Sequence, residues 1–104
     1  MPKPVSLSFG SAAILHAVAS GRRFGFDVMD ATGLTSGTVY PALDRLESAG
    51  YLRSKWESEE VAHREGRPAR RYFRLTAPGE AVLRAALDKY KALRPLSGFS
   101  PEEA

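Results

Sequence analysis

The spacing of apolar residues changes twice along this chain of 104 residues, and those two changes restrict its fold more than any other feature. As far as Gly50, apolar residues recur at intervals of three and four, which is typical of helices that bury one face. They alternate with polar residues over 51–57 and again over 70–76, which indicates two strands. Helical spacing then returns over 77–94. The sequence therefore predicts a mostly α protein with one β-hairpin.

Three helices are expected before the hairpin. The first covers 11–21, the second is a short helix that ends at Gly33, and the third runs to Ala49 after a cap at Thr35 or Ser36. The order helix, helix, helix, hairpin, long helix is that of a winged helix-turn-helix. We expect this domain with an N-terminal arm in 1–76, a dimerisation helix capped by Thr76 in 77–94, and a frayed tail in 95–104.

The third helix has a composition suited to reading DNA. In "TSGTVYPALDRLESAGY", Val39, Leu43 and Leu46 lie on one helical face and are expected in the core. The small polar start would be narrow enough for the major groove and would offer amides and hydroxyls to phosphates. The expected DNA contacts from this helix are Ser36, Gly37, Thr38, Tyr40, Pro41 and Arg45.

Two alternatives remain open for this stretch. A proline inside a helix removes one backbone donor and crowds the carbonyl four residues earlier. Pro41 could instead mark the first helical position, which would leave "TSGTVY" as a loop. Tyr40 could also belong to the core rather than to the surface.

The positive charge is concentrated in the hairpin. Residues 51–76 hold seven Lys/Arg and four Glu, and this difference accounts for the whole net charge of +3. Such clustering is typical of an element that binds a polyanion. The segment "SEEVAHREGRPA" between the strands reads as a long polar tip with a turn near its far end. We expect wing contacts to DNA from Arg64, Arg67, Arg70 and Arg71. The alternative is a solvated hairpin whose charges only protect an edge strand from pairing.

Enzyme and metal chemistry lack the residues that they need. There is no cysteine, no glycine loop of the phosphate-binding type, and only two histidines, His16 in an apolar helix and His63 in the hairpin. His16 is more typical of a packed core histidine than of a catalytic base. We expect no catalytic residue, no metal and no cofactor. No apolar run is long enough to span a membrane and the first residues do not resemble a secretory signal, so a cytoplasmic protein is expected.

Two blocks in fixed order resemble the PadR family of transcriptional regulators. They are "SGTVYPALDRLESAGYL" and, after "WE", "GRPARRYFRLTAPGEAVL". The resemblance covers 11 to about 87 and implies a compact member with a short last helix. It implies a homodimer in which the last helix packs against the partner and its first helix, so that two recognition helices meet a palindromic operator. Members of the family are usually repressors that a small molecule or a stress signal releases.

The expected dimer interface follows from this resemblance and from the wide apolar stripe of the last helix, which is too large to leave in water. The expected interface residues are Ile14, Leu15, Val18, Leu83, Leu87, Tyr90 and Leu93.

The expected partners are double-stranded DNA, a second copy of the chain and, as a candidate, a small-molecule inducer. Two other classes remain open, because a fold does not fix a function. One is a protein-interaction or RNA-binding module that lacks sequence-specific DNA readout. The other is a ligand-sensing dimer whose cavity is its main feature.

Overall fold

The computed structural model describes residues 7–91. The first six residues of the expected N-terminal arm, the interface residue Leu93 and the expected tail at 95–104 lie outside the described residues.

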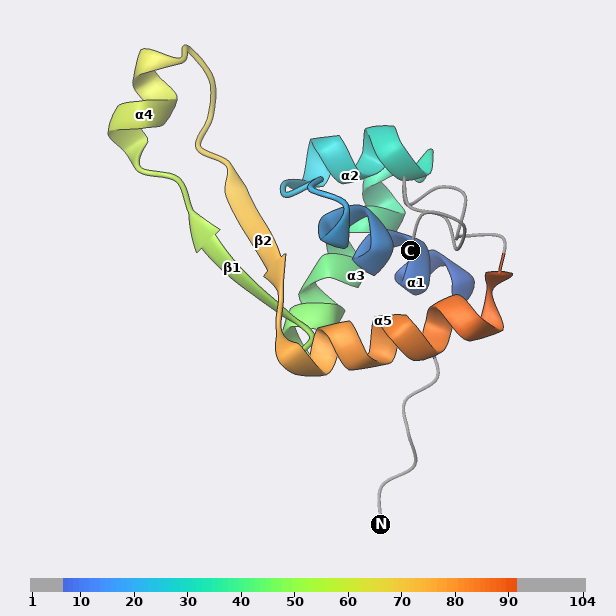
Figure 1. Cartoon of the computed structure of the whole chain (residues 1–104). Coiled ribbons are helices and arrows are strands. Elements are labelled where there is room, and N and C mark those ends of the chain that lie inside the picture. The colour runs from blue at the N-terminus through green and yellow to red at the C-terminus, as the bar shows by residue number, and fades with distance from the viewer. Residues whose placement is uncertain (1–6, 92–104) are drawn as a thin grey trace.

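The elements follow the order expected from the sequence, with one addition. Three helices come first, and a hairpin, which carries a helix at its tip, is followed by a last helix (Figure 1). The elements are α1 (Phe9–Ala19), α2 (Gly25–Thr32), α3 (Ser36–Ser48), β1 (Leu52–Trp56), α4 (Glu59–Arg64), β2 (Arg71–Leu75) and α5 (Ala77–Lys89). The hairpin stands away from the helices, and α5 runs along the base of the molecule. This is a winged helix-turn-helix, so the predicted fold class is confirmed.

Local signals account for where the helices begin and end. The Ser8 hydroxyl accepts a hydrogen bond from the Ser11 amide at 3.2 Å, so α1 begins at Phe9, two residues earlier than expected. Gly33, at φ +74°, ends α2 in the left-handed conformation. The Thr76 hydroxyl caps α5 by accepting from the Gly79 amide at 3.1 Å, as the sequence predicts.

Pro41 lies inside α3, which begins at Ser36. The alternative in which Pro41 opens the helix is therefore wrong. A proline at this position leaves the Gly37 carbonyl without its usual helical donor, because that donor would be the missing Pro41 amide. The helix continues because its other face is held by Val39, Leu43 and Leu46, all of which are buried.

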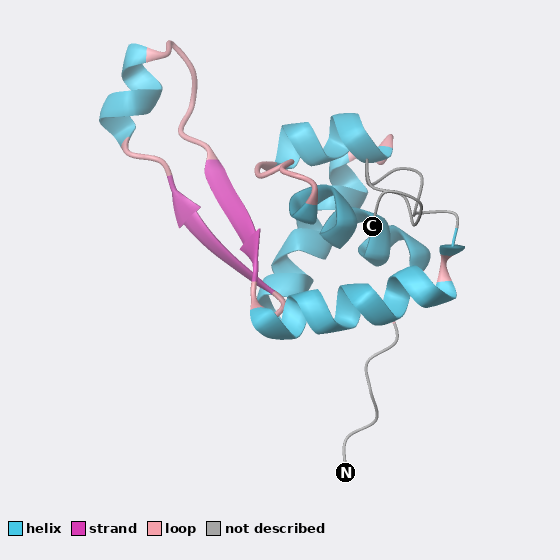
Figure 2. Ribbon diagram, in the orientation of Figure 1, coloured by secondary structure: helices cyan, strands magenta, loops and turns pink. Residues whose placement is uncertain are grey.

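The two strands pair antiparallel, with Leu52 opposite Leu75, Ser54 opposite Phe73 and Trp56 opposite Arg71. The tip between them corrects the sequence prediction, which expected only a polar loop with a turn. Residues Glu59–Arg64 form α4 at the tip of the hairpin (Figure 2). The Ser58 hydroxyl caps this helix by accepting from the Val61 amide at 3.2 Å. Acidic residues in its first turn and basic residues in its last turn complement the helix dipole.

One core joins the helices to the base of the hairpin. Its fully buried large side chains come from α1, α2, α3 and β1, and β2 and α5 add Phe73, Leu83 and Ala86. The fully buried set is Ile14, Leu15, Val28, Val39, Leu43 and Leu52. The core fixes the position of α3 relative to the base of the wing, and it leaves the start of α3 and the tip of the wing in solvent.

Candidate nucleic-acid interface

The start of α3 is exposed and has free donors. Ser36, Gly37 and Thr38 are all exposed. The Thr35 hydroxyl makes no cap hydrogen bond and lies 3.4 Å from the Thr38 hydroxyl instead. Within residues 7–91, no group accepts a hydrogen bond from the amides of Ser36 or Gly37. Two unpaired amides at the positive end of a helix dipole form a site that favours an anionic oxygen.

Tyr40 is held at the surface by a glycine of the preceding helix. Its side chain is 49% exposed, so it is not a core residue. A β-carbon placed on Gly25 would overlap the ring and hydroxyl of Tyr40, which shows that the ring lies directly against the backbone at the start of α2. The contact with Gly25 therefore fixes the position of the Tyr40 ring. Pro41 and Arg45 are exposed on the same helix.

Arg67 is committed to an ion pair inside the wing. Its guanidinium donates two hydrogen bonds to the Glu57 carboxylate, at 2.6 and 2.9 Å. The Tyr72 hydroxyl and the Arg70 amide also donate to Glu57, at 3.2 and 3.3 Å. The hydrogen bond from Arg67 is the main reason why the pKa of Glu57 falls from 4.5 to about 2. The charge of Arg67 is thus used to join the end of β1 to the chain that leads into β2.

Arg71 connects the wing to the recognition helix. Its guanidinium donates to Asp44 and to the Ser54 hydroxyl, each at 3.0 Å, and also to Glu47. Asp44 and Glu47 lie on one face of α3, whereas Arg71 begins β2. We call this set, Arg71 with Asp44, Glu47 and Ser54, the wing strut.

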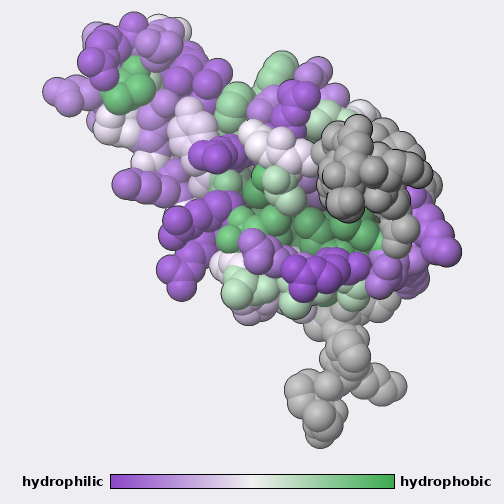
Figure 3. Space-filling model, viewed as in Figure 1, coloured by the Kyte–Doolittle hydropathy of each residue, from purple (hydrophilic) through white to green (hydrophobic). Residues whose placement is uncertain are grey.

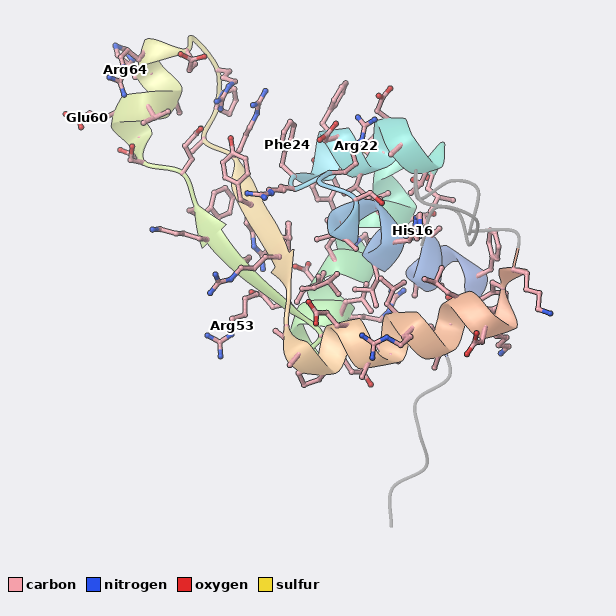
Figure 4. The ribbon with its side chains drawn as sticks, in the orientation of Figure 1. His16, Arg22, Phe24, Arg53, Glu60 and Arg64 are labelled. Atoms are coloured by element: carbon pink, nitrogen blue, oxygen red, sulfur yellow. The ribbon has the colours of Figure 1, made fainter. Side chains whose placement is uncertain are left out.

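The other two arginines expected to contact DNA from the wing, Arg64 and Arg70, have no carboxylate partner within the described chain. Arg64 is exposed at the end of α4, at the tip of the wing (Figure 4). Phe24 lies between the start of α2 and β2. The Arg70 guanidinium stacks 4.1 Å from the centre of the Phe24 ring. These two arginines keep their charge available to a ligand.

A second basic surface was not proposed from the sequence. Arg53 and Arg74 face each other across the hairpin, and Lys55 and Arg23 lie beside them around a depression on the same surface. Directly opposed like charges destabilise a sheet. The described residues provide no acidic ion-pair partner for any of the four. The alternation of "YLRSKWE" placed Arg53 and Lys55 on one face, so the signal was present in the sequence.

The sequence matches the model of the "Transcriptional regulator PadR-like family" over residues 14–85. This chain belongs to that family. Comparison with curated proteins finds no significant match.

Several solved structures have the same fold. The chain is similar to smu.1704 from Streptococcus mutans UA159, with a TM-score of 0.69 and 28% identity over 91% of this chain and 90% of that one. It is also similar to a PadR family transcription regulator from Clostridium difficile R20291, with a TM-score of 0.69 and 20% identity over 86% and 94% of the two chains. BpsR of Bordetella bronchiseptica gives a TM-score of 0.68 and 20% identity, covering 99% of this chain and 74% of BpsR.

A groove with an apolar floor and a charged rim runs beside α5 of this PadR-like chain. It has a volume of about 840 Å³. Its apolar lining includes Val18, Leu75, Leu83 and Leu87, and its charged lining residues are Arg23, Arg74, Glu80 and Arg84. Figure 3 shows hydrophobic residues gathered in a hollow between the base of the hairpin and α5. Of the expected interface residues, Ile14 and Leu15 are fully buried by their own chain, and Val18 and Leu83 are 5% and 7% exposed. Leu87 and Tyr90 are partly exposed.

Groups suited to other chemistry are few in the PadR-like chain. Within residues 7–91, no three His, Cys, Asp or Glu side chains are placed to hold a metal ion, and no helix is long and apolar enough to cross a membrane. His16 is buried, which lowers its pKa, and its Nε2 atom has no hydrogen-bond partner in the described part of the chain. His63 is exposed on α4. The family places the protein among transcriptional regulators.

Proposed function

We propose that this PadR-like regulator is a repressor that binds a palindromic operator as a homodimer in the cytoplasm and is released by a small molecule or a stress signal. The observation that carries the proposal is the start of α3, where exposed small residues and two free amides lie next to a wing that the strut fixes to the same helix. This geometry suits a helix that enters the major groove while the wing follows the adjacent backbone.

The proposed DNA contacts divide by the chemistry of their side chains. Ser36, Gly37 and Thr38 offer amides and hydroxyls to phosphates, and Tyr40 and Pro41 present a hydroxyl and an apolar ring to base edges. Arg45 reaches the backbone one turn further along α3. In the wing, Arg64 and Arg70 are proposed to contact DNA directly. Arg67 and Arg71 are proposed to act through their ion pairs, which hold the wing at the angle that DNA requires.

The proposed dimer covers the groove beside α5. The exposed apolar part of the groove, with Leu75 and Leu87, favours a partner surface, because leaving it in water is unfavourable. Leu87 and Tyr90 are the accessible members of the expected set. Ile14, Leu15, Val18 and Leu83 would support the interface from below, since their own chain covers most of their surface.

A small-molecule signal is proposed on two grounds. Members of the family are usually controlled in this way, and the solved structure of BpsR concerns regulation of its DNA binding by 6-hydroxynicotinic acid. That compound is a property of BpsR, and the inducer of the present protein is not assumed to be the same.

The test is a fluorescence-anisotropy titration of the purified protein against a labelled duplex of its own upstream DNA, because members of the family often control their own gene. A scrambled competitor and two salt concentrations complete the design. We expect saturable binding that survives the competitor and weakens with salt. Equal binding to both duplexes would contradict a sequence-specific regulator. No binding at low salt would favour a protein-interaction or RNA-binding module.

A further inference from the structure

A cleft lies between the wing and the start of the recognition helix, separate from the groove beside α5. Its volume is about 440 Å³, within the range of about 300–1,000 Å³ that is usual for small-molecule sites. We call it the aromatic cleft, because Phe24, Phe26, Tyr40 and Trp56 all line it.

Most of the large apolar side chains that are exposed within the described residues line the aromatic cleft. Four large apolar side chains are exposed within residues 7–91, and three of them line this cleft. Phe26 is 71% exposed, Trp56 is 64% exposed and Tyr40 is 49% exposed. A flat aromatic ligand would cover these rings and would gain both apolar burial and ring stacking.

The polar lining of the cleft selects the charge of the ligand. Asp44 and Arg71 line the cleft but are bonded to each other, and Arg67 is bonded to Glu57. Arg70 has no carboxylate partner among the described residues, and its guanidinium is held over the Phe24 ring. One fixed, uncompensated guanidinium beside aromatic walls is complementary to an anionic group on a flat ring.

We propose that the aromatic cleft binds a planar aromatic anion, whose ring packs on Phe26, Tyr40 and Trp56 and whose anionic group bonds to Arg70. We also propose that this ligand and operator DNA exclude each other, a step that rests on the proposed function. Tyr40 lines the cleft and is also a proposed base contact, and Arg70 is a proposed wing contact. A bound ligand therefore occupies the same side chains that the operator needs.

Trp56 is the only tryptophan of the chain, so its fluorescence reports directly on the cleft. The full-length protein without DNA is titrated with anthraquinone-2-sulfonate, a flat anion that quenches tryptophan. A neutral analogue of similar shape, 2-(hydroxymethyl)anthraquinone, is the matched probe. We expect saturable quenching by the anion and binding at least tenfold weaker for the neutral probe. We expect the Arg70→Gln variant to bind the anion at least tenfold more weakly than the native protein does.

Two variants test the place of binding. Phe26→Ala should weaken binding of the anion at least tenfold. It should leave the melting temperature nearly unchanged, since this side chain is mostly in solvent. Phe9→Ala is the control, because Phe9 is 48% exposed but packs on Tyr90, away from the cleft. No saturable quenching by the anion, equal affinity in Phe26→Ala, or an equal loss in Phe9→Ala would overturn the site.

The exclusion step is tested separately by adding the anion to the complex with labelled operator. We expect release of DNA at concentrations that match the fluorescence titration, and less release from the Phe26→Ala complex. A ternary complex that keeps the operator would overturn the exclusion. If no operator is found, the titration without DNA still decides whether the aromatic cleft binds the anion, so the two proposals fail independently.

Discussion

At the scale of single residues, Gly25 determines where Tyr40 points. The ring of Tyr40 rests against the Gly25 backbone, in space that any side chain on residue 25 would occupy. The sequence shows a glycine at the start of a short helix but not which residue packs on it, because the contact joins α2 to α3. The surface of the recognition helix thus depends on a residue outside it.

Gly25→Ala should displace the Tyr40 ring and weaken specific DNA binding by about 1–3 kcal/mol, the range for loss of a good base contact. Binding to scrambled DNA should change little, because phosphate contacts remain. Anisotropy titrations on both duplexes provide the measurement. Gly10→Ala is the control, since a methyl group there would meet nothing within 4 Å. Equal losses on both duplexes would remove Tyr40 from base recognition.

Glu57 makes the stability of the wing depend on pH. Its pKa is about 2 in the folded protein against an ordinary value of 4.5, so the carboxylate is stabilised by folding. That contribution is fully present above pH 4.5 and is lost as the pH falls from 4.5 towards 2. Thermal melts from pH 7 to pH 3 should show Glu57→Gln less stable than the native protein at pH 7, with the difference shrinking below about pH 4. A difference independent of pH would mean that the ionised pair is not the cause.

At the scale of elements, the wing is fixed to the recognition helix by charge rather than by apolar packing alone. The strut joins the first residue of β2 to two carboxylates on α3. The wing then has a defined angle relative to α3, although α4 at its tip stands clear of the helices. Two elements that must contact one DNA duplex together benefit from such a connection.

Arg71→Ala should therefore weaken operator binding while leaving its salt dependence nearly unchanged. The reason is that Arg71 is already paired with Asp44 and Glu47 rather than with a phosphate, so it would release no counterion from DNA. Arg64→Ala is the comparison, because Arg64 is exposed and should lower the slope of log K against log salt by about 0.9 for one lost phosphate contact. Titrations at four salt concentrations give both slopes. A slope reduced equally in Arg71→Ala would show that it leaves the strut to bind phosphate.

The sequence predicted the elements better than the contacts between them. The helical and alternating spacing of apolar residues located α1, α2, α3, both strands and α5, because each of these elements buries one face. It missed α4, whose six residues are too few to show a period, although Ser58 and the charges of the first and last turns were signals for it. It could not show the ion pairs of Arg67 and Arg71, because their carboxylate partners, Glu57 and Asp44, come close only after folding.

At the scale of the whole molecule, the two sides of the chain offer different surfaces. The start of α3 and the wing carry free donors and charge, whereas the side beside α5 carries a groove in which apolar residues are exposed between charged ones (Figure 3). In the proposed complex, the start of α3 would face DNA and the groove beside α5 would face the second subunit, while Arg23 and Arg74 line both this groove and the basic surface of the hairpin. In a two-fold dimer the groove would face the same surface of the partner, which would set the spacing between the two recognition helices.

Leu87→Glu should convert the proposed dimer to monomers, because a carboxylate placed at this apolar position of the groove loses its hydration when the partner covers it. Light scattering coupled to gel filtration gives the mass, and the same samples are titrated with operator. Leu87 is only partly buried in the single chain, so the monomer should stay folded by circular dichroism. Ala81→Glu is the matched control, since Ala81 is exposed on α5 but does not line the groove, and the variant should keep both the dimer and DNA binding. A Leu87→Glu protein that remains dimeric would place the interface elsewhere, and a monomer that still binds the full operator tightly would show that one recognition helix and one wing are sufficient.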